Sequence, residues 1–138
     1  MYFPNGRILI FAKAPVPGYA KTRLIPVLGE QGAADLHAKL IHRTVDLAVA
    51  SKLAPVELWI CGDTGLEFFD AFRDAVGGRI HLQTGPDLGA RMAHALEQAL
   101  RDAAFAVLIG TDCPALDVAH LERACVALTE GADAVLGP

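Results

Sequence analysis

The feature that most constrains the fold is the alternation of short apolar runs with helix-length amphipathic segments along the chain. Each run has the length and composition of a strand buried on both faces of a sheet. Five strands are predicted: Arg7–Ala12, Val56–Cys61, Arg79–Gln83, Phe105–Ile109 and Ala132–Leu136. Four helices are predicted between them: Gln31–Ser51, Gly65–Val76, Leu88–Asp102 and Asp117–Thr129. Because strands alternate with helices, we expect an α/β fold with βαβ units and a mainly parallel sheet.

The predicted helix ends carry capping residues. Asp117 is a candidate N-cap, Gly131 lies where a C′ glycine would end the last helix, and Gly77–Gly78 closes the second. The last strand reads as central and buried, yet the sequence stops at Pro138 directly after it. We therefore expect that the sequence lacks a C-terminal portion.

Length and composition indicate a single globular domain over residues 1–138. A hydrophobic fraction of 53% excludes a disordered chain. No apolar stretch approaches the roughly 20 residues that span a bilayer. The run Ile8–Ala12 predicts a strand rather than a signal peptide, so we expect a cytoplasmic protein. Cys61, Cys113 and Cys125 lack CxxC spacing, which favours free thiols in a reducing compartment.

Positive charge gathers in the loop after the first strand, Lys13–Leu24, although the net charge of the chain is −4. Lys13, Lys21 and Arg23 all precede the first acidic residue of the chain, Glu30. A basic loop on an acidic protein favours a small anionic ligand over a nucleic acid. Ammonium and guanidinium groups together suit a diphosphate. An ordinary solvated basic loop is the alternative.

The same loop is stiffened by Pro15 and Pro17, and Gly18 lets the backbone approach a ligand. Two familiar nucleotide motifs do not match it. A Walker A loop requires Gly-Lys-Ser/Thr, but the residue before Lys21 is alanine, and GxGxxG is absent. The loop therefore belongs neither to a P-loop NTPase nor to a standard NAD site.

A second candidate is Asp112, within the segment Gly110–Pro114 that follows the fourth strand. Ligands of open α/β sheets bind at the carboxyl ends of the strands, so this carboxylate is expected beside the first loop. It is placed to bind Mg²⁺ or Mn²⁺, which would neutralise charge on a leaving group. A turn-capping role is the alternative. Cys113 has no histidine tied to it by sequence and is expected to be a small buried side chain.

The third candidate segment, Gly85–Met92, leads from the third strand into a helix. A helix N-terminus attracts anions, and Gly89 allows a base or ribose to come close. The alternative is a plain helix start with Asp87 as the cap and Arg91 exposed. The histidines lack metal spacing and are expected to be ordinary helix or strand residues: His37, His42, His81, His94 and His120.

These segments, in this order, resemble a little-characterised bacterial family of the GT-A-type nucleotide-diphospho-sugar transferase superfamily, long known as a domain of unknown function. The matching residues are AKAPVPGYAKTRL at 12–24, Gln83, Gly85, Leu88-Gly89, Arg91-Met92 and Gly110–Pro114. The chain is similar, more distantly, to molybdenum-cofactor and phospholactate guanylyltransferases. In the family, a segment like DAVLGP is followed by Asp-Gly-Gly-Tyr, which this sequence does not reach.

The resemblance implies a three-layer α/β/α domain with a Rossmann-like sheet and a set of site residues. The implied nucleotide-binding residues are Lys13, Pro17, Gly18, Lys21, Arg23, Leu88 and Gly89. The lysines and the arginine would contact phosphates, and Leu88 and Gly89 would lie near the base or ribose. Asp112 would bind Mg²⁺ or Mn²⁺ as the counterpart of the last Asp in an Asp-x-Asp motif. Gly110 reduces that motif to one carboxylate, and no catalytic base can be named.

By resemblance, the expected reaction is metal-assisted transfer of a sugar from a nucleotide-diphosphate donor. The expected partner is a nucleotide or nucleotide sugar, with no nucleic acid and no membrane span. Nucleotidyl transfer with release of pyrophosphate is the first alternative. A nucleotide-binding module without catalysis is the second, and the single carboxylate and the early end of the sequence favour it.

Overall fold

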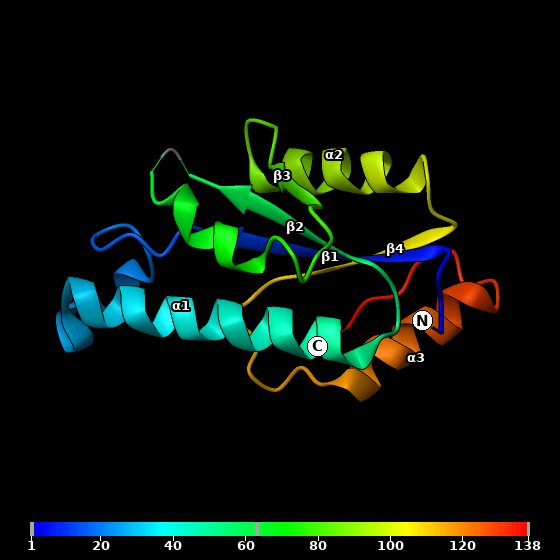
Figure 1. Cartoon of the computed structure of the whole chain (residues 1–138), viewed down its shortest axis with the longest axis horizontal. Helices are drawn as coiled ribbons and strands as arrows, with labels where there is room; N and C mark the ends of the chain where they lie inside the picture. Colours follow the sequence, from blue (N-terminus) through cyan, green and yellow to red (C-terminus); the bar gives the residue numbers. More distant parts are fainter. Residues whose placement is uncertain (1, 63, 138) are drawn as a thin grey trace.

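The computed structural model describes residues 2–62 and 64–137, in which four strands form one sheet (Figure 1). The strands are β1 (Gly6–Lys13), β2 (Val56–Cys61), β3 (Ile80–Leu82) and β4 (Phe105–Ile109). The helices are α1 (Ile25–Ser51), α2 (Leu88–Leu100) and α3 (Val118–Thr129), with short 3₁₀ helices η1 (Thr22–Leu24) and η2 (Leu66–Phe72). The strand order is β3-β2-β1-β4, and every neighbouring pair is parallel, as the alternation predicts.

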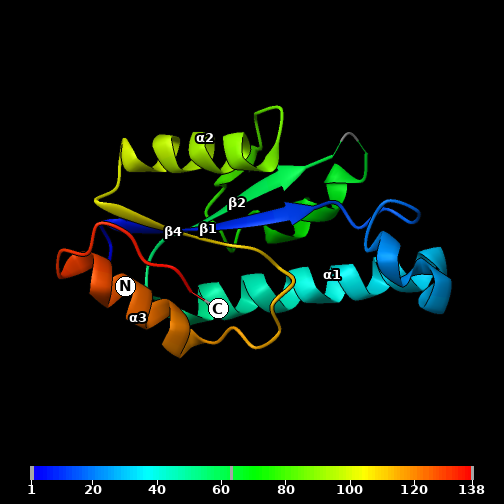
Figure 2. The same ribbon diagram turned by 180° about the vertical axis from the view of Figure 1, so that it is seen from behind.

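Helices cover both faces of the sheet and give three layers. α2 lies on one face, whereas α1 and α3 lie on the other (Figure 1, Figure 2). Successive side chains of a strand point to opposite faces. Ile8 and Ile10 of β1 therefore join the core on the α1 side, and Leu9 and Phe11 join the core on the α2 side. Complete burial of an isoleucine or leucine contributes about 2 kcal/mol, which explains the unbroken apolar sequence of this central strand.

The caps predicted at the two ends of the last helix are present. Asp117 accepts a hydrogen bond from the backbone N–H of His120 at 3.0 Å, and Nδ1 of His120 accepts one from the N–H of Asp117 at 3.1 Å. Asp87 caps α2 by accepting from the N–H of Ala90 at 2.8 Å. Gly131, with φ +106°, follows α3 where a C′ glycine was expected. These caps fix where α2 and α3 begin, and only the one at α3 is reciprocal.

The predicted second helix is wrong. The segment 65–76 contains the short 3₁₀ helix η2 followed by turns. Leu66, Phe69 and Phe72 recur at every third residue, which is the period of a 3₁₀ helix. Phe69 and Phe72 are buried in the core on the α1 side. A 3₁₀ helix places side chains three residues apart on the same face, so that Phe69 and Phe72 can both enter the core.

The predicted fifth strand is also wrong, because residues 132–136 form no strand in the described structure and are exposed. The N–H of Ala132 donates to the carbonyl of Ala127 at the end of α3, and Leu136 is 99% exposed. An apolar run becomes a strand only when its backbone groups pair with a neighbouring strand. This segment pairs with no strand of the described sheet.

The largest difference in element boundaries is at α1; β1, β3, α2 and α3 differ from their predicted ranges by one or two residues at an end. α1 begins at Ile25 and contains a break at Gly29, where φ is 74°. The segment after the break corresponds to the predicted helix. β3 covers only Ile80–Leu82. It is an edge strand that pairs with β2 alone, and edge strands are often very short.

The cysteines Cys61, Cys113 and Cys125 are free, as expected. Cys125 is fully buried, and this burial raises the pKa of its thiol. Cys113 is half-buried rather than a fully covered core residue. Among the helices that the structure describes, none is long and apolar enough to cross a membrane.

Candidate functional site

The candidate site lies at the carboxyl edge of the sheet. β1 is the central strand, with β2 on one side and β4 on the other, both parallel to it. The loops that follow these strands therefore leave from the same edge. Lys13 is the last residue of β1, and Asp112 lies three residues beyond the end of β4 at Ile109. The expected proximity of the first loop and Asp112 follows from this arrangement.

An ion pair joins the two segments: the ammonium group of Lys21 contacts Oδ1 of Asp112. The side chain of Lys21 is only 15% exposed, whereas that of Asp112 is 75% exposed. Lys21 also has a left-handed backbone (φ 51°), which costs a residue with a Cβ about 1–2 kcal/mol. The loop thus holds one ammonium group in a fixed, partly covered position beside an open carboxylate.

Lys13 has a different role from Lys21. Its ammonium group donates a hydrogen bond to the carbonyl oxygen of Tyr19 at 2.9 Å, which ties the start of the loop to its middle. Gly18 has φ +87°, a conformation that favours glycine, and Arg23 is exposed on η1. Lys13 therefore shapes the loop, whereas Arg23 is open to a ligand.

A cavity of about 420 Å³ opens between the first loop and the segment after β2. Its walls include Val16 and Pro17 from the loop and Gly65, Glu67 and Phe68 from the second segment. The volume lies within the range of small-molecule sites, and the mixture of apolar walls and few polar groups is typical of them. Pro17 was expected to contact a nucleotide, but the contribution of residues 64–68 was missed by sequence reasoning.

Gly65 explains how these two segments come so close. A Cβ at this position would lie 2.6 Å from Cγ2 of Val16, and its φ is +71°. Only glycine accommodates both the contact and the backbone conformation. The sequence signal for the second wall of the cavity is therefore the single residue Gly65, which belongs to no recognised motif.

Leu88 and Gly89 occupy the exposed N-terminus of α2, after the β3–α2 loop. Neither lines the cavity beside the first loop. The expectation that Arg91 is simply exposed is wrong: its Nε donates to the carbonyl of Gly85 at 3.0 Å, and its Nη1 lies 3.1 Å from Sγ of Cys61. Arg91 thus fixes the β3–α2 loop to the carboxyl end of β2.

His37 is a further residue of the site that sequence reasoning missed. It lies on α1, is 7% exposed, and its Nε2 is 2.7 Å from the carbonyl oxygen of Lys13. Its Nδ1 is buried without a hydrogen-bond partner in the described part of the chain. Loss of hydration lowers the pKa of His37 most strongly, the hydrogen bond to Lys13 opposes this, and the Lys21 cation adds to the lowering. The neutral ring with a proton on Nε2 donates to the end of β1.

This lowered pKa predicts a pH dependence of stability. The unfolded chain binds a proton at His37 near the ordinary value of about 6.5, whereas the folded chain resists it. The free energy of unfolding should therefore fall as the pH drops from 7.5 to 5.5, and His37→Gln should reduce this slope. Urea unfolding at several pH values measures it. His42→Gln removes an exposed histidine from the same helix and is the control; an unchanged slope in His37→Gln would contradict the prediction.

Asp112 offers a divalent metal a single, exposed carboxylate. Among the described residues, no group of three or more histidine, cysteine or acidic side chains could hold a metal ion by itself. Mg²⁺, however, is commonly bound through one or two carboxylates together with the phosphates of a substrate. The exposed carboxylate of Asp112 is compatible with a metal bound in this way.

The sequence profile of a bacterial family described as "Uncharacterized protein conserved in bacteria (DUF2064)" matches residues 44–138, more than half of the chain. The chain belongs to this family. The first loop precedes the matched residues, so its role rests on the geometry above. No curated protein matches the chain significantly.

Among solved structures, the chain is similar to a "putative nucleotide-diphospho-sugar transferase" from Desulfovibrio desulfuricans G20, with 30% sequence identity and a TM-score of 0.79. The match covers 91% of this chain and 55% of that one, so this member of the family spans about half the length of the solved structure. The predicted three-layer fold of nucleotide-diphospho-sugar transferase type is confirmed.

Proposed function

We propose that this chain forms the donor-binding part of a metal-dependent glycosyltransferase that uses a nucleotide-diphosphate sugar. The observation that carries the proposal is the Lys21–Asp112 pair, which joins a basic loop and a carboxylate at the carboxyl edge of a parallel sheet. The transferase name of the solved neighbour supports the same class of reaction.

The nucleoside is assigned to the cavity between the first loop and residues 64–68. Val16 and Phe68 offer apolar surface for a base, and Glu67 offers a carboxylate that can accept hydrogen bonds from amino or hydroxyl groups. Leu88 and Gly89, on the exposed N-terminus of α2, keep the role expected for them near the base or ribose. Neither residue lines the cavity itself.

The diphosphate is assigned to Lys21 and the exposed Arg23. A diphosphate carries more negative charge than a carboxylate and therefore competes with Asp112 for the ammonium group of Lys21. When Lys21 turns to the phosphates, both oxygens of Asp112 become free to bind a metal. Mg²⁺ or Mn²⁺ at this position would neutralise charge that develops on the departing diphosphate.

The same residues suit nucleotidyl transfer, in which a nucleoside triphosphate binds and pyrophosphate leaves. A panel of nucleotide sugars and acceptors, assayed with Mn²⁺ for both products, separates the two reactions. Release of a nucleoside diphosphate supports the glycosyltransferase. Release of pyrophosphate from a nucleoside triphosphate supports the nucleotidyltransferase. Nucleotide binding with neither product would support the non-catalytic module, which the single carboxylate at the end of β4 favours.

Replacing Asp112 by asparagine tests the metal assignment. We expect the part of the thermal stabilisation by UDP or GDP that depends on Mn²⁺ to disappear, because the amide is a much poorer ligand than the carboxylate. Stabilisation by nucleotide without metal should persist, since Lys21 is then unpaired. Melting curves with nucleotide, metal and both measure the effect. Asp46→Asn, at an exposed position of α1, is the control; equal Mn²⁺ effects in Asp112→Asn and the wild type would refute the assignment.

A further inference from the structure

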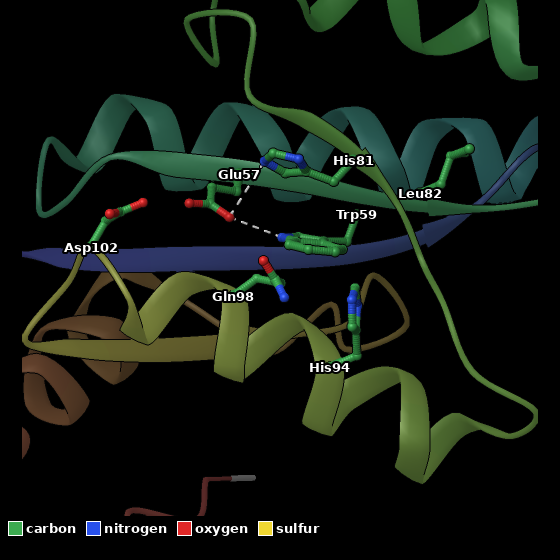
Figure 3. A pocket seen from close by; sticks show the side chains of 7 residues that line it. All are labelled: Glu57, Trp59, His81, Leu82, His94, Gln98 and Asp102. Atoms are coloured by element: carbon green, nitrogen blue, oxygen red, sulfur yellow. Dashed lines mark hydrogen bonds and ion pairs between the residues drawn. The ribbon is translucent and has the colours of Figure 1, made fainter.

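A second cavity, of about 470 Å³, lies between α2 and the β2–β3 part of the sheet (Figure 3). It is separate from the loop cavity and shares no lining residue with it. Glu57 lies one residue from the start of β2, and Asp102 lies just after the end of α2. Both residues are thus toward the amino edge of the sheet, away from Lys21 and Asp112.

The wall of this cavity contains a buried carboxylate. Glu57 is 8% exposed, and its Oε1 accepts a hydrogen bond from Nε1 of Trp59 at 3.0 Å. Nε of Arg7 forms an ion pair with Oε2 at 3.7 Å, and Nε2 of His81 lies 3.7 Å from Oε1; neither contact is short enough for a hydrogen bond. Nη1 of Arg7 already donates to the carbonyl of Gly6 at 2.7 Å. A carboxylate has about four acceptor sites, so Glu57 retains acceptor capacity that the protein does not use.

The rest of the cavity is aromatic and polar. The ring of His81 stacks at a tilt on Trp59, with centroids 4.6 Å apart, and the ring of His94 meets Trp59 edge to face at 5.9 Å. Nδ1 of His94 is buried without a hydrogen-bond partner among the described residues. Figure 3 shows Glu57, Trp59 and His81 side by side on the sheet, with His94 opposite them on α2. A buried carboxylate beside an indole is suited to a flat cation.

Within the protein, the buried carboxylate of Glu57 is compensated by one hydrogen bond, from Trp59, and by the ion pair with Arg7, which makes no hydrogen bond to it. Moving a carboxylate out of water costs several kcal/mol unless hydrogen bonds and opposite charge replace the lost hydration. The neighbouring positions of β2, Val56 and Leu58, are ordinary buried apolar residues. Asp102, which also lines the cavity, adds a second negative charge at its exposed rim. The lining therefore attracts positive charge.

We propose that this cavity is a second small-molecule site, which binds an organic cation with forked N–H donors on a flat body, such as an amidinium or guanidinium compound. The N–H groups donate to Glu57, and the flat body lies against the aromatic rings of Trp59 and His94. Asp102 draws the cation to the opening. The site is independent of the proposed nucleotide site.

The test uses benzamidine as the cationic probe. Trp59 is the only tryptophan of the chain, so its indole N–H gives a single side-chain signal in a ¹⁵N-correlation spectrum and reports directly on the bond to Glu57. Benzamidine should shift this signal saturably in the millimolar range. Benzamide, which is neutral, and benzoate, which is anionic, should bind about tenfold more weakly or not at all. Equal responses to benzamidine and benzamide would overturn the proposal.

Variants locate the site. Glu57→Gln should weaken benzamidine about tenfold, and Glu97→Gln, at an exposed position of α2, should leave it unchanged. Because Glu57 is buried, Asp102→Asn at the exposed rim is a second variant that does not disturb the core, and it should weaken benzamidine about threefold. Lys21→Ala should bind benzamidine as the wild type does. Unchanged affinity in Asp102→Asn or in a folded Glu57→Gln protein would overturn the proposal.

Discussion

Replacement of Lys21 by alanine is expected to weaken the binding of UDP or GDP about 10- to 100-fold. A hydrogen bond to a charged group contributes about 1.5–3 kcal/mol, and this ammonium group is held in a partly covered position where water screens it less. Isothermal titration calorimetry of both proteins measures the change. Lys21→Arg should retain more of the affinity than Lys21→Ala, because it keeps the charge.

The chain offers a matched control for this substitution. Lys52 is the other described non-glycine residue with a positive φ, 54° against 51° for Lys21. It ends α1 before β2 begins, at the amino edge of the sheet, and is therefore remote from the first loop. Lys52→Ala removes the same charge from the same backbone conformation and should leave nucleotide affinity unchanged. If both variants bind equally well, Lys21 does not contact the phosphates.

The second large effect is expected from Gly65→Ala, which should lower the free energy of unfolding by about 2–5 kcal/mol. A left-handed conformation costs a residue with a Cβ about 1–2 kcal/mol, and overpacking costs about 1–3 kcal/mol. Both apply here, because φ is +71° and the added Cβ would lie 2.6 Å from Val16. Urea unfolding measures the loss, and weaker nucleotide binding should accompany it.

Gly78→Ala separates these two causes. Gly78 has φ +76°, close to that of Gly65, but a Cβ there meets no atom within 4 Å. Its replacement should therefore cost only the backbone part, about 1–2 kcal/mol. In a double-mutant cycle, Val16→Ala should recover part of the loss caused by Gly65→Ala and none of the loss caused by Gly78→Ala. Equal losses in both glycine variants would show that contact between the two loops is unimportant.

Local sequence was sufficient to predict the elements whose signals are local. Apolar runs gave β1, β2 and β4, and the Asp117 and Asp87 caps marked the beginnings of α3 and α2. Two predicted elements are wrong, because contacts between distant segments determine the structure that those residues adopt. Residues 65–76 took a 3₁₀ form that buries Phe69 and Phe72, and residues 132–136 lacked a neighbouring strand with which to pair.

The candidate site divides in the same way. The basic loop and Asp112 were recognisable because charge and position after a strand are visible in the sequence. His37, Phe68 and Gly65 were not, because each gains its role from a segment far along the chain: His37 from Lys13, and Phe68 and Gly65 from the first loop. In the sequence, Glu57 is one residue of a predicted apolar strand. Only the packing of α2 on the sheet shows that its carboxylate lines a cavity.

The sequence by itself determined the mainly parallel sheet and the basic loop after its first strand. The alternation of apolar runs with helix-length segments suffices for the sheet, and the positions of the lysines and the arginine suffice for the loop. Only the tertiary structure decided that Lys21 meets Asp112, since that contact spans 91 residues and depends on β4 pairing directly with β1. Strand order is set by packing between segments distant in the chain. No local pattern records which strand ends become neighbours.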